Sequence, residues 1–427
     1  MKHSIILFLL CTSLSFSARG SITLEQCVEQ SIANYPLIQK YGLIAATRDI
    51  DLSEINKTWL PRIGVYGQLT VQNTVPSFPE SLSNVIANMG QEIKGLGKTQ
   101  YKIGVDISQS IWDGGASAAR REVARSENAV QKAALDVELY QIRQRVENLY
   151  FAILLTEEQI SQNTVTHQLL CNNLERLRSM LQNGTAMQTD LDMVEAQALV
   201  LNQNITQARS AVKGYLATMT LFTGIDIEGE KLAMPSAEFP LYTEPNRPEL
   251  ELYSRRQEAN NAANRLADTA LMPKIGLFAQ GYYGYPGFDY FSSMLNRDLS
   301  INLLAGIKIS WSIDSFYTKK NTSRKTALSN DNIASDRETF LFNTKIQAAT
   351  QTEAINGLRE IIQDDARIVN LRTNVRKAAE SQLTNGVIDA TTLLTKISDE
   401  SIAILSAKFH EIQLLQEIYK LKYTLDR

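Results

Sequence analysis

A stretch of nearly seventy residues without proline, 113–181, constrains the fold more than any other part of the sequence. Its apolar residues recur at intervals of three and four, at Leu135, Leu139, Ile142, Val146, Leu149 and Ile153 and again at Leu170, Leu174, Leu177 and Leu181. An apolar repeat of about 3.5 residues predicts a helix that packs sideways in a left-handed coiled coil. At helical rise it would be roughly 100 Å long, about three times the diameter of a small domain.

The chain also repeats itself. Asn34, Pro36 and Pro61 reappear at an offset of 212, as Asn246, Pro248 and Pro273. Further on the offset is 202, where the matches are Ile107-Ser108 with Ile309-Ser310, and Leu181, Asn183, Gly184 and Leu191 with Leu383, Asn385, Gly386 and Leu393. A ten-residue shift in the loop after Gln72 reconciles the two offsets, so we predict two structural copies.

Each copy follows one plan, the first over 21–222 and the second over 246–427, with a proline-containing connector over 223–245. The predicted elements are helices 23–59 and 247–271, strands 62–72, 101–112, 274–285 and 299–313, long helices 113–182 and 315–383, and return helices 188–222 and 391–425. An Asn cap with proline in the first turn is expected at Asn34 and Asn246. Each long helix stops at Asn-Gly, which suits a left-handed turn.

The first twenty residues, 1–20, predict a secretory signal peptide. Two basic residues precede an apolar core over 5–11, and small residues follow it, with cleavage at 18–20 or at 15–17. Cys11 belongs to the signal core. The mature chain has no further apolar run of 18 residues, the length of a membrane helix, so it is exported and either periplasmic or a β-barrel.

Composition excludes several classes of protein. Hydrophobic residues make up 44% and charged residues 21% of the 427, a globular mixture. The net charge of -3 and the absence of a Lys/Arg cluster argue against nucleic acid as a partner. Export permits a disulfide, but the predicted layout holds Cys27 and Cys171 farther apart than the roughly 7 Å that a bridge spans. We therefore predict two free thiols.

The four strands carry the functional argument. Each is about ten residues long and alternates apolar with polar side chains, as a tilted transmembrane β-strand does. A soluble sheet with its apolar face inward is the alternative, and any single strand would favour it. Aromatic residues shift the balance toward membrane-interface girdles: Trp59, Trp112 and Trp311 at strand–helix junctions, and Tyr282, Tyr283, Tyr285 and Tyr290 near the opposite end. Four charged residues are predicted to line the barrel lumen: Lys102, Asp106, Lys274 and Lys308.

Four strands do not close on themselves in lipid, where each unpaired backbone group costs several kcal/mol. Because small barrels need about eight strands, the protomer must assemble, with twelve strands in a trimer or sixteen in a tetramer. The helices would then form a tube that continues the barrel. The predicted fold class is mainly α, with duplicated long-helix hairpins forming a periplasmic α-barrel and a membrane β part.

On these features the chain resembles the TolC-like outer-membrane efflux and secretion factors over its whole mature length. The resemblance is carried by the duplication and by 34–36, 59–61, 111–115 and the two Asn-Gly tips. It implies a homotrimer in the outer membrane, with a twelve-stranded barrel and a periplasmic tunnel. It also implies a passive exit duct for small molecules or drugs, served by an inner-membrane pump through a periplasmic adaptor.

The resemblance also assigns two functional regions. The hairpin tips would contact the adaptor, although turn geometry alone explains Asn-Gly there: Asn183, Gly184, Thr185, Asn385, Gly386 and Val387. Family members narrow the tunnel entrance with acidic side chains shortly after the second tip, where this chain has Thr392 and Thr395 with Asp389 nearby. Asp190 is equally well explained as an entrance residue or as a helix first-turn acid.

Enzymatic motifs are missing from the sequence. His167 and His410 fall on different helices and are expected at helix surfaces, and no cofactor or metal site is predicted. The duct could equally serve type I protein secretion. A periplasmic adaptor is the alternative from another class, and it predicts one helical hairpin flanked by compact β domains. An autonomous porin would end in a strand, whereas this chain is predicted to end in a helix.

Overall fold

The computed structural model describes residues 21–90, 95–236, 238–239 and 244–426. The predicted signal peptide lies outside the described residues. The described chain divides into two compact units. We call Tyr41–Ala134 with Glu251–Arg337 the sheet unit, and the described residues of Met1–Lys40, Leu135–Leu250 and Glu338–Arg427 the helical unit.

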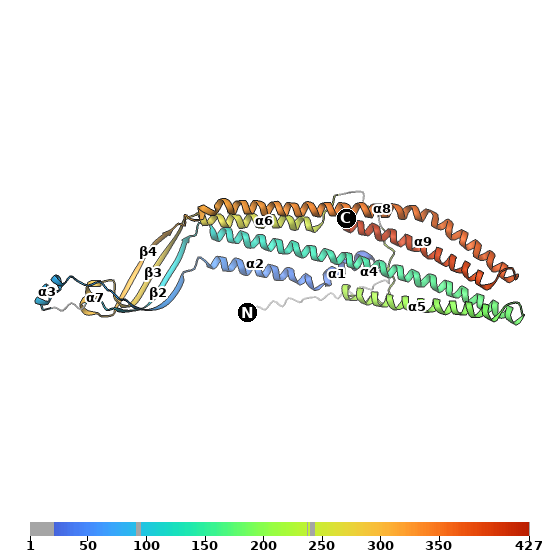
Figure 1. Ribbon diagram of the computed structural model, residues 1–427, viewed down its shortest axis with the longest axis horizontal. Coiled ribbons are helices and arrows are strands. Elements are labelled where there is room, and N and C mark those ends of the chain that lie inside the picture. The colour runs from blue at the N-terminus through green and yellow to red at the C-terminus, as the bar shows by residue number, and fades with distance from the viewer. Residues whose placement is uncertain (1–20, 91–94, 237, 240–243, 427) are drawn as a thin grey trace, which may run out of the picture. The chain divides into compact units, whose positions relative to one another are not determined.

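The sheet unit contains one antiparallel sheet in the order β1-β2-β3-β4 (Figure 1). Its strands are β1 (Arg62–Val71), β2 (Thr99–Trp112), β3 (Lys274–Tyr285) and β4 (Ser300–Ser310). Two short helices, α3 (Glu80–Asn88) and α7 (Tyr290–Asn296), lie in the connections. Among the described residues β1 and β4 have a strand partner on one side only.

Helices precede and follow the strands. They are α2 (Lys40–Lys57), α6 (Pro248–Asp268) with the 3-10 turn η2 (Thr269–Leu271), and the first parts of α4 (Ala116–Gln182) and α8 (Ser315–Thr384). Polar contacts pair them. The Asn128 side chain donates to the Ile44 carbonyl at 2.7 Å, linking α4 to α2, and Asn260 donates to Asn330 at 2.7 Å, linking α6 to α8. The two copies are thus paired in the same manner.

The helical unit contains α1 (Leu24–Asn34), the 3-10 turn η1 (Pro36–Gln39), α5 (Gln188–Thr223), α9 (Ala390–Leu425) and the remainder of α4 and α8. One core forms where α4 meets α1, α5 and α9, and Val146 and Ile153 there are 0% exposed. Its other large members are Leu24, Tyr150, Phe151, Met219 and Tyr419. The middle of the three-and-four repeat of α4, at Ile142, Val146 and Ile153, therefore faces this core.

A second core joins the two helical hairpins near their tips, α4 with α5 and α8 with α9 (Figure 1). Leu170, Leu174 and Leu177 of α4 pack with Leu383 of α8 and Leu393 of α9. Leu191 and Leu393, which match at the offset of 202, both contribute to this core, so equivalent positions of the two predicted copies meet here.

The expected Asn caps are wrong in detail. Asn34 ends α1, and its amide donates to the Leu221 and Phe222 carbonyls at 3.3 and 3.2 Å. The Asn246 backbone N–H donates to the Leu425 carbonyl at 3.0 Å. Both residues thus satisfy carbonyls at the end of a return helix, groups that lack helical partners. Proline still opens the next element of each copy.

The predicted fold class is confirmed for the single chain, whose described residues are mainly long helices together with a four-stranded antiparallel sheet. Among the described helices, none combines the length and the apolar character needed to cross a bilayer. Both cysteines of the described chain are free, with Cys27 buried and Cys171 partly exposed.

Candidate functional site: the sheet faces and the helix tips

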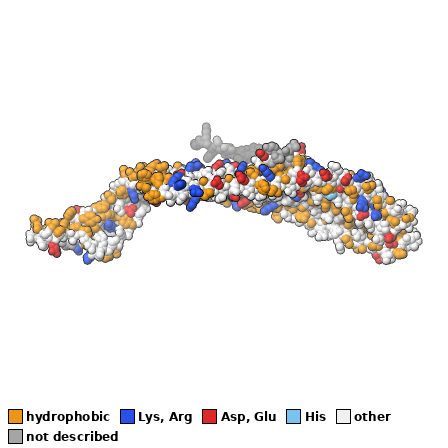
Figure 2. Space-filling view, turned by 45° about the horizontal axis from the view of Figure 1, so that its top comes forward, with side chains coloured by type: hydrophobic (Ala, Val, Ile, Leu, Met, Phe, Trp, Pro, Cys, Tyr) orange, Lys and Arg blue, Asp and Glu red, His pale blue; other side chains and the backbone are white. Residues whose placement is uncertain are grey.

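One face of the sheet is apolar and exposed. The register aligns Val65, Val105 and Leu303 in one row through Gly281, so their side chains lie on the same face. The exposed fractions reach 75% for Val65, 77% for Ile301 and 79% for Leu303. Figure 2 shows hydrophobic side chains gathered over the part of the sheet unit that carries the strands. A contiguous exposed apolar surface of this kind marks a contact with another protein or with lipid.

The opposite face is polar. Successive residues of a strand point to opposite faces, and the register places all four residues predicted for the lumen, Lys102, Asp106, Lys274 and Lys308, on this one face. The Gln280 amide donates to the Tyr66 hydroxyl at 3.0 Å, and the Lys102 ammonium lies 4.9 Å from the Tyr282 ring centre.

Glycines make room for the aromatic rings of the polar face. A Cβ at Gly104 would meet the Tyr66 ring at 2.8 Å, and one at Gly306 would meet the Phe278 ring at 3.0 Å. Glycine at these two positions therefore has a packing reason, since a larger residue would displace a ring.

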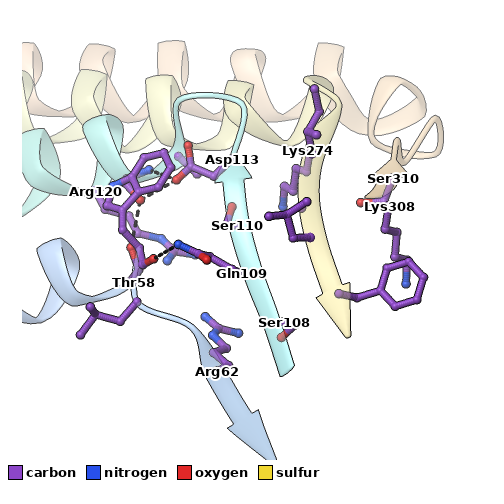
Figure 3. A pocket seen from close by; sticks show the side chains of 18 residues that line it. Thr58, Arg62, Ser108, Gln109, Ser110, Asp113, Arg120, Lys274, Lys308 and Ser310 are labelled. Atoms are coloured by element: carbon purple, nitrogen blue, oxygen red, sulfur yellow. Dashed lines mark hydrogen bonds between the residues drawn. The ribbon is translucent and has the colours of Figure 1, made fainter. Parts of the chain in front are cut away.

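A hollow of about 540 Å³ lies where the polar face meets the adjoining helices (Figure 3). The polar side chains that line it are Thr58, Arg62, Ser108, Gln109, Ser110, Asp113, Ser117, Arg120, Lys274, Lys308 and Ser310. Four are basic and one is acidic. Arg62 and Arg120 were not among the predicted lumen residues.

Asp113 fixes the turn between β2 and α4. Its carboxylate accepts hydrogen bonds from the Gly115 N–H at 3.0 Å and from the Ser117 N–H at 2.7 Å. Gly114 and Gly115, with φ of 70° and 85°, supply the left-handed conformations that the turn requires. Partial burial opposes ionisation, but the bonds from Ser117 and Gly115 outweigh it and hold the pKa of Asp113 below its usual value.

The three tryptophans lie at the helix-proximal end of the sheet, as expected. Trp59, Trp112 and Trp311 are 40%, 41% and 56% exposed, and the Trp311 indole donates to the Leu271 carbonyl at 2.9 Å. Strict alternation continued past Ser110 would put Trp112 on the polar face, but the register shifts between Ser110 and Trp112 and pairs Trp112 with Ile275 of the apolar face. A bulge of this kind turns the following side chain to the other face.

The two hairpin tips share one geometry. At the first tip Gly184 has φ 73° and donates to the Leu181 carbonyl at 3.0 Å, and the Thr185 N–H donates to the Met180 carbonyl at 2.8 Å. At the second tip Gly386 has φ 70°, and Gly386 and Val387 make the equivalent bonds to Leu383 and Gln382 at 2.9 Å each. Both are Schellman caps. The Asn183 and Asn385 side chains are exposed, and Val387 is 69% exposed.

The residues predicted near the tunnel entrance belong to helix starts. The Asp190 carboxylate accepts the Met187 N–H at 3.0 Å at the start of α5, and the Asp389 carboxylate accepts the Thr392 N–H at 2.8 Å at the start of α9. The hydrogen bonds from Thr392 hold the pKa of Asp389 below its usual value. The Thr395 hydroxyl donates to the Thr391 carbonyl at 3.0 Å. Each of these groups therefore has a local helix-terminus or helix-surface role.

A buried carboxylate in the helical unit, that of Glu147, and the partly exposed charges near it were not foreseen. Arg143 donates to the Glu147 carboxylate at 2.9 Å and lies 3.5 Å from the Asp426 carboxylate. Burial outweighs the attraction of Arg143 and raises the pKa of Glu147 to about 7. The spacing of four residues on α4 was the available signal, but the burial of a charged side chain is not visible in it.

The two histidines of the described chain lie on different helices, as predicted, and both are partly buried. His410 is partly buried and its Nδ1 lies 2.9 Å from the Asp365 carboxylate, so the expected helix-surface position is only approximate. His167 lies on α4, with its Nδ1 3.8 Å from the Cys171 sulfur. Across the described residues no group of His, Cys, Asp and Glu is arranged to hold a metal ion.

No family model matches the sequence, and no curated protein sequence matches it either. Solved structures do. The open state of the MtrE outer membrane channel of Neisseria gonorrhoeae matches with TM-score 0.65 at 14% identity, covering 94% of this chain and 88% of that one. The CmeC outer membrane channel of Campylobacter jejuni matches with TM-score 0.64 at 13% identity, covering 94% and 85%. The outer membrane protein VceC of Vibrio cholerae matches with TM-score 0.63 at 12% identity, covering 94% of each chain.

The chain has the TolC-like fold. The described residues form two helical hairpins and one four-stranded sheet, an architecture that differs from the single hairpin flanked by β domains that the adaptor alternative predicts. The CmeC and MtrE structures that share the TolC-like fold are outer membrane channels.

Proposed function

We propose that the protein is the outer-membrane channel-tunnel of a tripartite efflux system. Three copies would complete one twelve-stranded barrel, and their helices would form a tunnel in the periplasm. Small molecules would pass through it passively, delivered by an inner-membrane pump through a periplasmic adaptor. The polar face, with Lys102, Asp106, Lys274 and Lys308, would line the pore, and the apolar face would contact lipid.

The observation that carries this proposal is the sheet itself. It has one exposed apolar face, one polar face and two edges without partners among the described residues. Exposed edges and an exposed apolar face are unstable in water and prone to pairing. Closure of β4 of one copy onto β1 of the next would satisfy both edges, and lipid would cover the apolar face.

An exposed stripe on α8 supports assembly from several copies. Ile361, Ile368, Leu371 and Val375 recur at intervals of seven, three and four, and are 47%, 45%, 57% and 45% exposed. This spacing is that of a coiled-coil seam. A second copy of the chain is the partner we propose for it.

Adaptor contact is proposed for the tips. The residues of both tips are exposed, and their backbone N–H groups donate to carbonyls at the end of the preceding helix: Asn183, Gly184 and Thr185 at the first tip, and Asn385, Gly386 and Val387 at the second. For the entrance, Asp190, Asp389, Thr392 and Thr395 are proposed to lie near the aperture. An Asp190→Ala channel with raised resting conductance would favour a gate, and unchanged conductance would favour the helix-start role.

Cysteine crosslinking between edge strands tests the proposed barrel. Variants pairing Val65→Cys with one cysteine at a time along β4, at Ile301, Leu303 or Ile307, should give disulfide-linked trimers in outer-membrane fractions for at least one pair. Ile103→Cys with Tyr283→Cys is the matched control, because these residues are register partners within one sheet and should link without joining chains. A detergent-free, water-soluble monomer with no crosslinked species would overturn the proposal.

A further inference from the structure

We propose that the helix-proximal end of the polar face makes the pore prefer anions, so that the duct favours small anionic solutes. The inference rests on the proposed function, since the polar face lines a pore only if the barrel closes. It concerns what the pore selects, which the fold does not determine.

The strands differ in charge from the rest of the chain. The whole protein has a net charge of -3, whereas β1 to β4 carry four basic side chains and one acidic one, a net charge of +3. All five lie on the polar face: Arg62, Lys102, Asp106, Lys274 and Lys308. The positive charge is therefore concentrated where solutes would pass.

Three of the basic residues occupy successive rows at the helix-proximal end. Lys274 pairs with Ser310, Lys308 belongs to the row of Gly276 and Ser110, and Arg62 to the row of Ser108. Rows on one face are about 7 Å apart, so the three cations lie within about 14 Å along the strands. Each row also contributes a serine hydroxyl, which can donate to an anion.

These cations have little local compensation. No carboxylate among the described residues lies within ion-pair distance of Arg62, Arg120, Lys274 or Lys308. Asp113 is the one carboxylate lining the hollow, and its oxygens accept bonds from Gly115 and Ser117. The hollow retains a net charge of +3.

A narrow passage with low-dielectric walls concentrates the field of its charges and raises the local concentration of counter-ions. Three copies would place three such positive clusters around one pore. Because the Debye length is about 8 Å at physiological salt, the clusters act on solutes within the pore rather than at a distance. The preference should therefore weaken as salt rises.

Reversal potentials in planar bilayers test the inference on the full-length trimer. In a KCl gradient the wild-type channel should pass chloride in preference to potassium. The variant Arg62→Gln/Lys274→Gln/Lys308→Gln should lower the chloride-to-potassium permeability ratio at least about threefold. Asp106→Asn is the matched variant of opposite sign and should raise the ratio.

The outcomes separate the two proposals. A wild-type channel that prefers potassium, or a triple variant whose ratio is unchanged, would overturn the anion preference while leaving the duct intact. Correctly assembled trimers without conductance would overturn the duct itself, and this inference with it. Native gel mobility of each variant establishes that the trimer has formed before conductance is compared.

Discussion

The two long helices occupy equivalent positions in the two predicted copies, yet they pack differently within the helical unit. α4 has 67 residues and α8 has 70. From residue 135 onward α4 buries its apolar repeat, with Leu135, Leu139, Ile142, Val146 and Ile153 all at most 5% exposed. The buried residues of α8 are Thr344, Ile355, Asp365, Ala379 and Leu383.

The two long helices thus share a backbone plan but differ in how completely neighbouring elements of the same chain cover them. α4 has α1, α5 and α9 around it and completes its core inside one chain. α8 leaves a seam-like stripe, with Leu371 57% exposed, that one chain does not cover. We expect the α4 seam to determine whether the protomer folds and the α8 stripe to determine whether protomers assemble.

A charge in the α4 core should have the largest effect. Val146 is 0% exposed, and Val146→Asp would bury a carboxylate without a designed partner, which costs several kcal/mol. We expect loss of the folded protein, measured as loss of protease resistance and of outer-membrane yield. Val165→Asp is the control on the same helix, since Val165 is 61% exposed. Equal resistance of both variants would contradict the assignment of the core.

The same charge on the α8 stripe should spare the protomer and prevent assembly. Leu371→Asp places a carboxylate in the proposed interface between copies, so trimers should give way to monomers on native gels while helical content stays unchanged. Asn370→Asp adds an identical charge one residue away, on another face of α8, and should leave trimers intact. If Leu371→Asp still forms stable trimers, the α8 stripe is not part of the interface between copies.

Much of the fold is predictable from sequence because it depends on short periods. The three-and-four spacing of α4 and the alternation of the strands each identify a face, and the register then confirms that Lys102 and Asp106 share one. The bulge at Trp112 breaks the alternation with no preceding glycine or proline as a signal. Arg120 lines the hollow because the turn at Gly114 and Gly115 sets the direction in which α4 begins. The spacing of apolar residues does not determine that direction.

The burial of the Glu147 carboxylate could not be predicted from the sequence, for a different reason. Glu147 follows the buried Val146 directly, and a helix period places it at the edge of the apolar seam. Whether that edge is covered depends on residues hundreds of positions away, such as Asp426 near Arg143. The roles of the tips and of the entrance residues stay predictions, because the local geometry of Asp190 and Gly386 is fully explained by helix ends.

Acidity should stabilise the α4 core through Glu147. Its pKa is about 7 in the folded chain against an ordinary value of 4.5, so the folded state binds more protons than the unfolded state between these values. The stability contribution of Glu147 is therefore lost as pH rises from about 4.5 to 7. Glu147→Gln should be more stable than wild type at pH 8, by up to about 3 kcal/mol, and equal near pH 4.

Unfolding midpoints followed by circular dichroism across this pH range measure the effect. Glu138→Gln is the matched control, because Glu138 is an exposed glutamate of the same helix, 3.9 Å from Lys40, and should change the midpoint little. A constant difference between Glu147→Gln and wild type at all pH values would show that the carboxyl titrates normally.

Only a modest change in protomer stability is expected at the tips that end α4 and α8. No atom lies within 4 Å of a Cβ added at Gly184 or Gly386, so Gly184→Val and Gly386→Val cost only the strain of positive φ, about 1–2 kcal/mol. Trimers should still form, while efflux, measured as drug susceptibility of cells, should fail if the tips contact a partner. Gly229→Val separates strain from contact, because Gly229 has φ 86° and equally open surroundings away from the tips. If Gly229→Val impairs efflux as strongly as the tip variants, backbone strain and not partner contact accounts for the loss. If the tip variants retain efflux, the tips have no role beyond forming the turn.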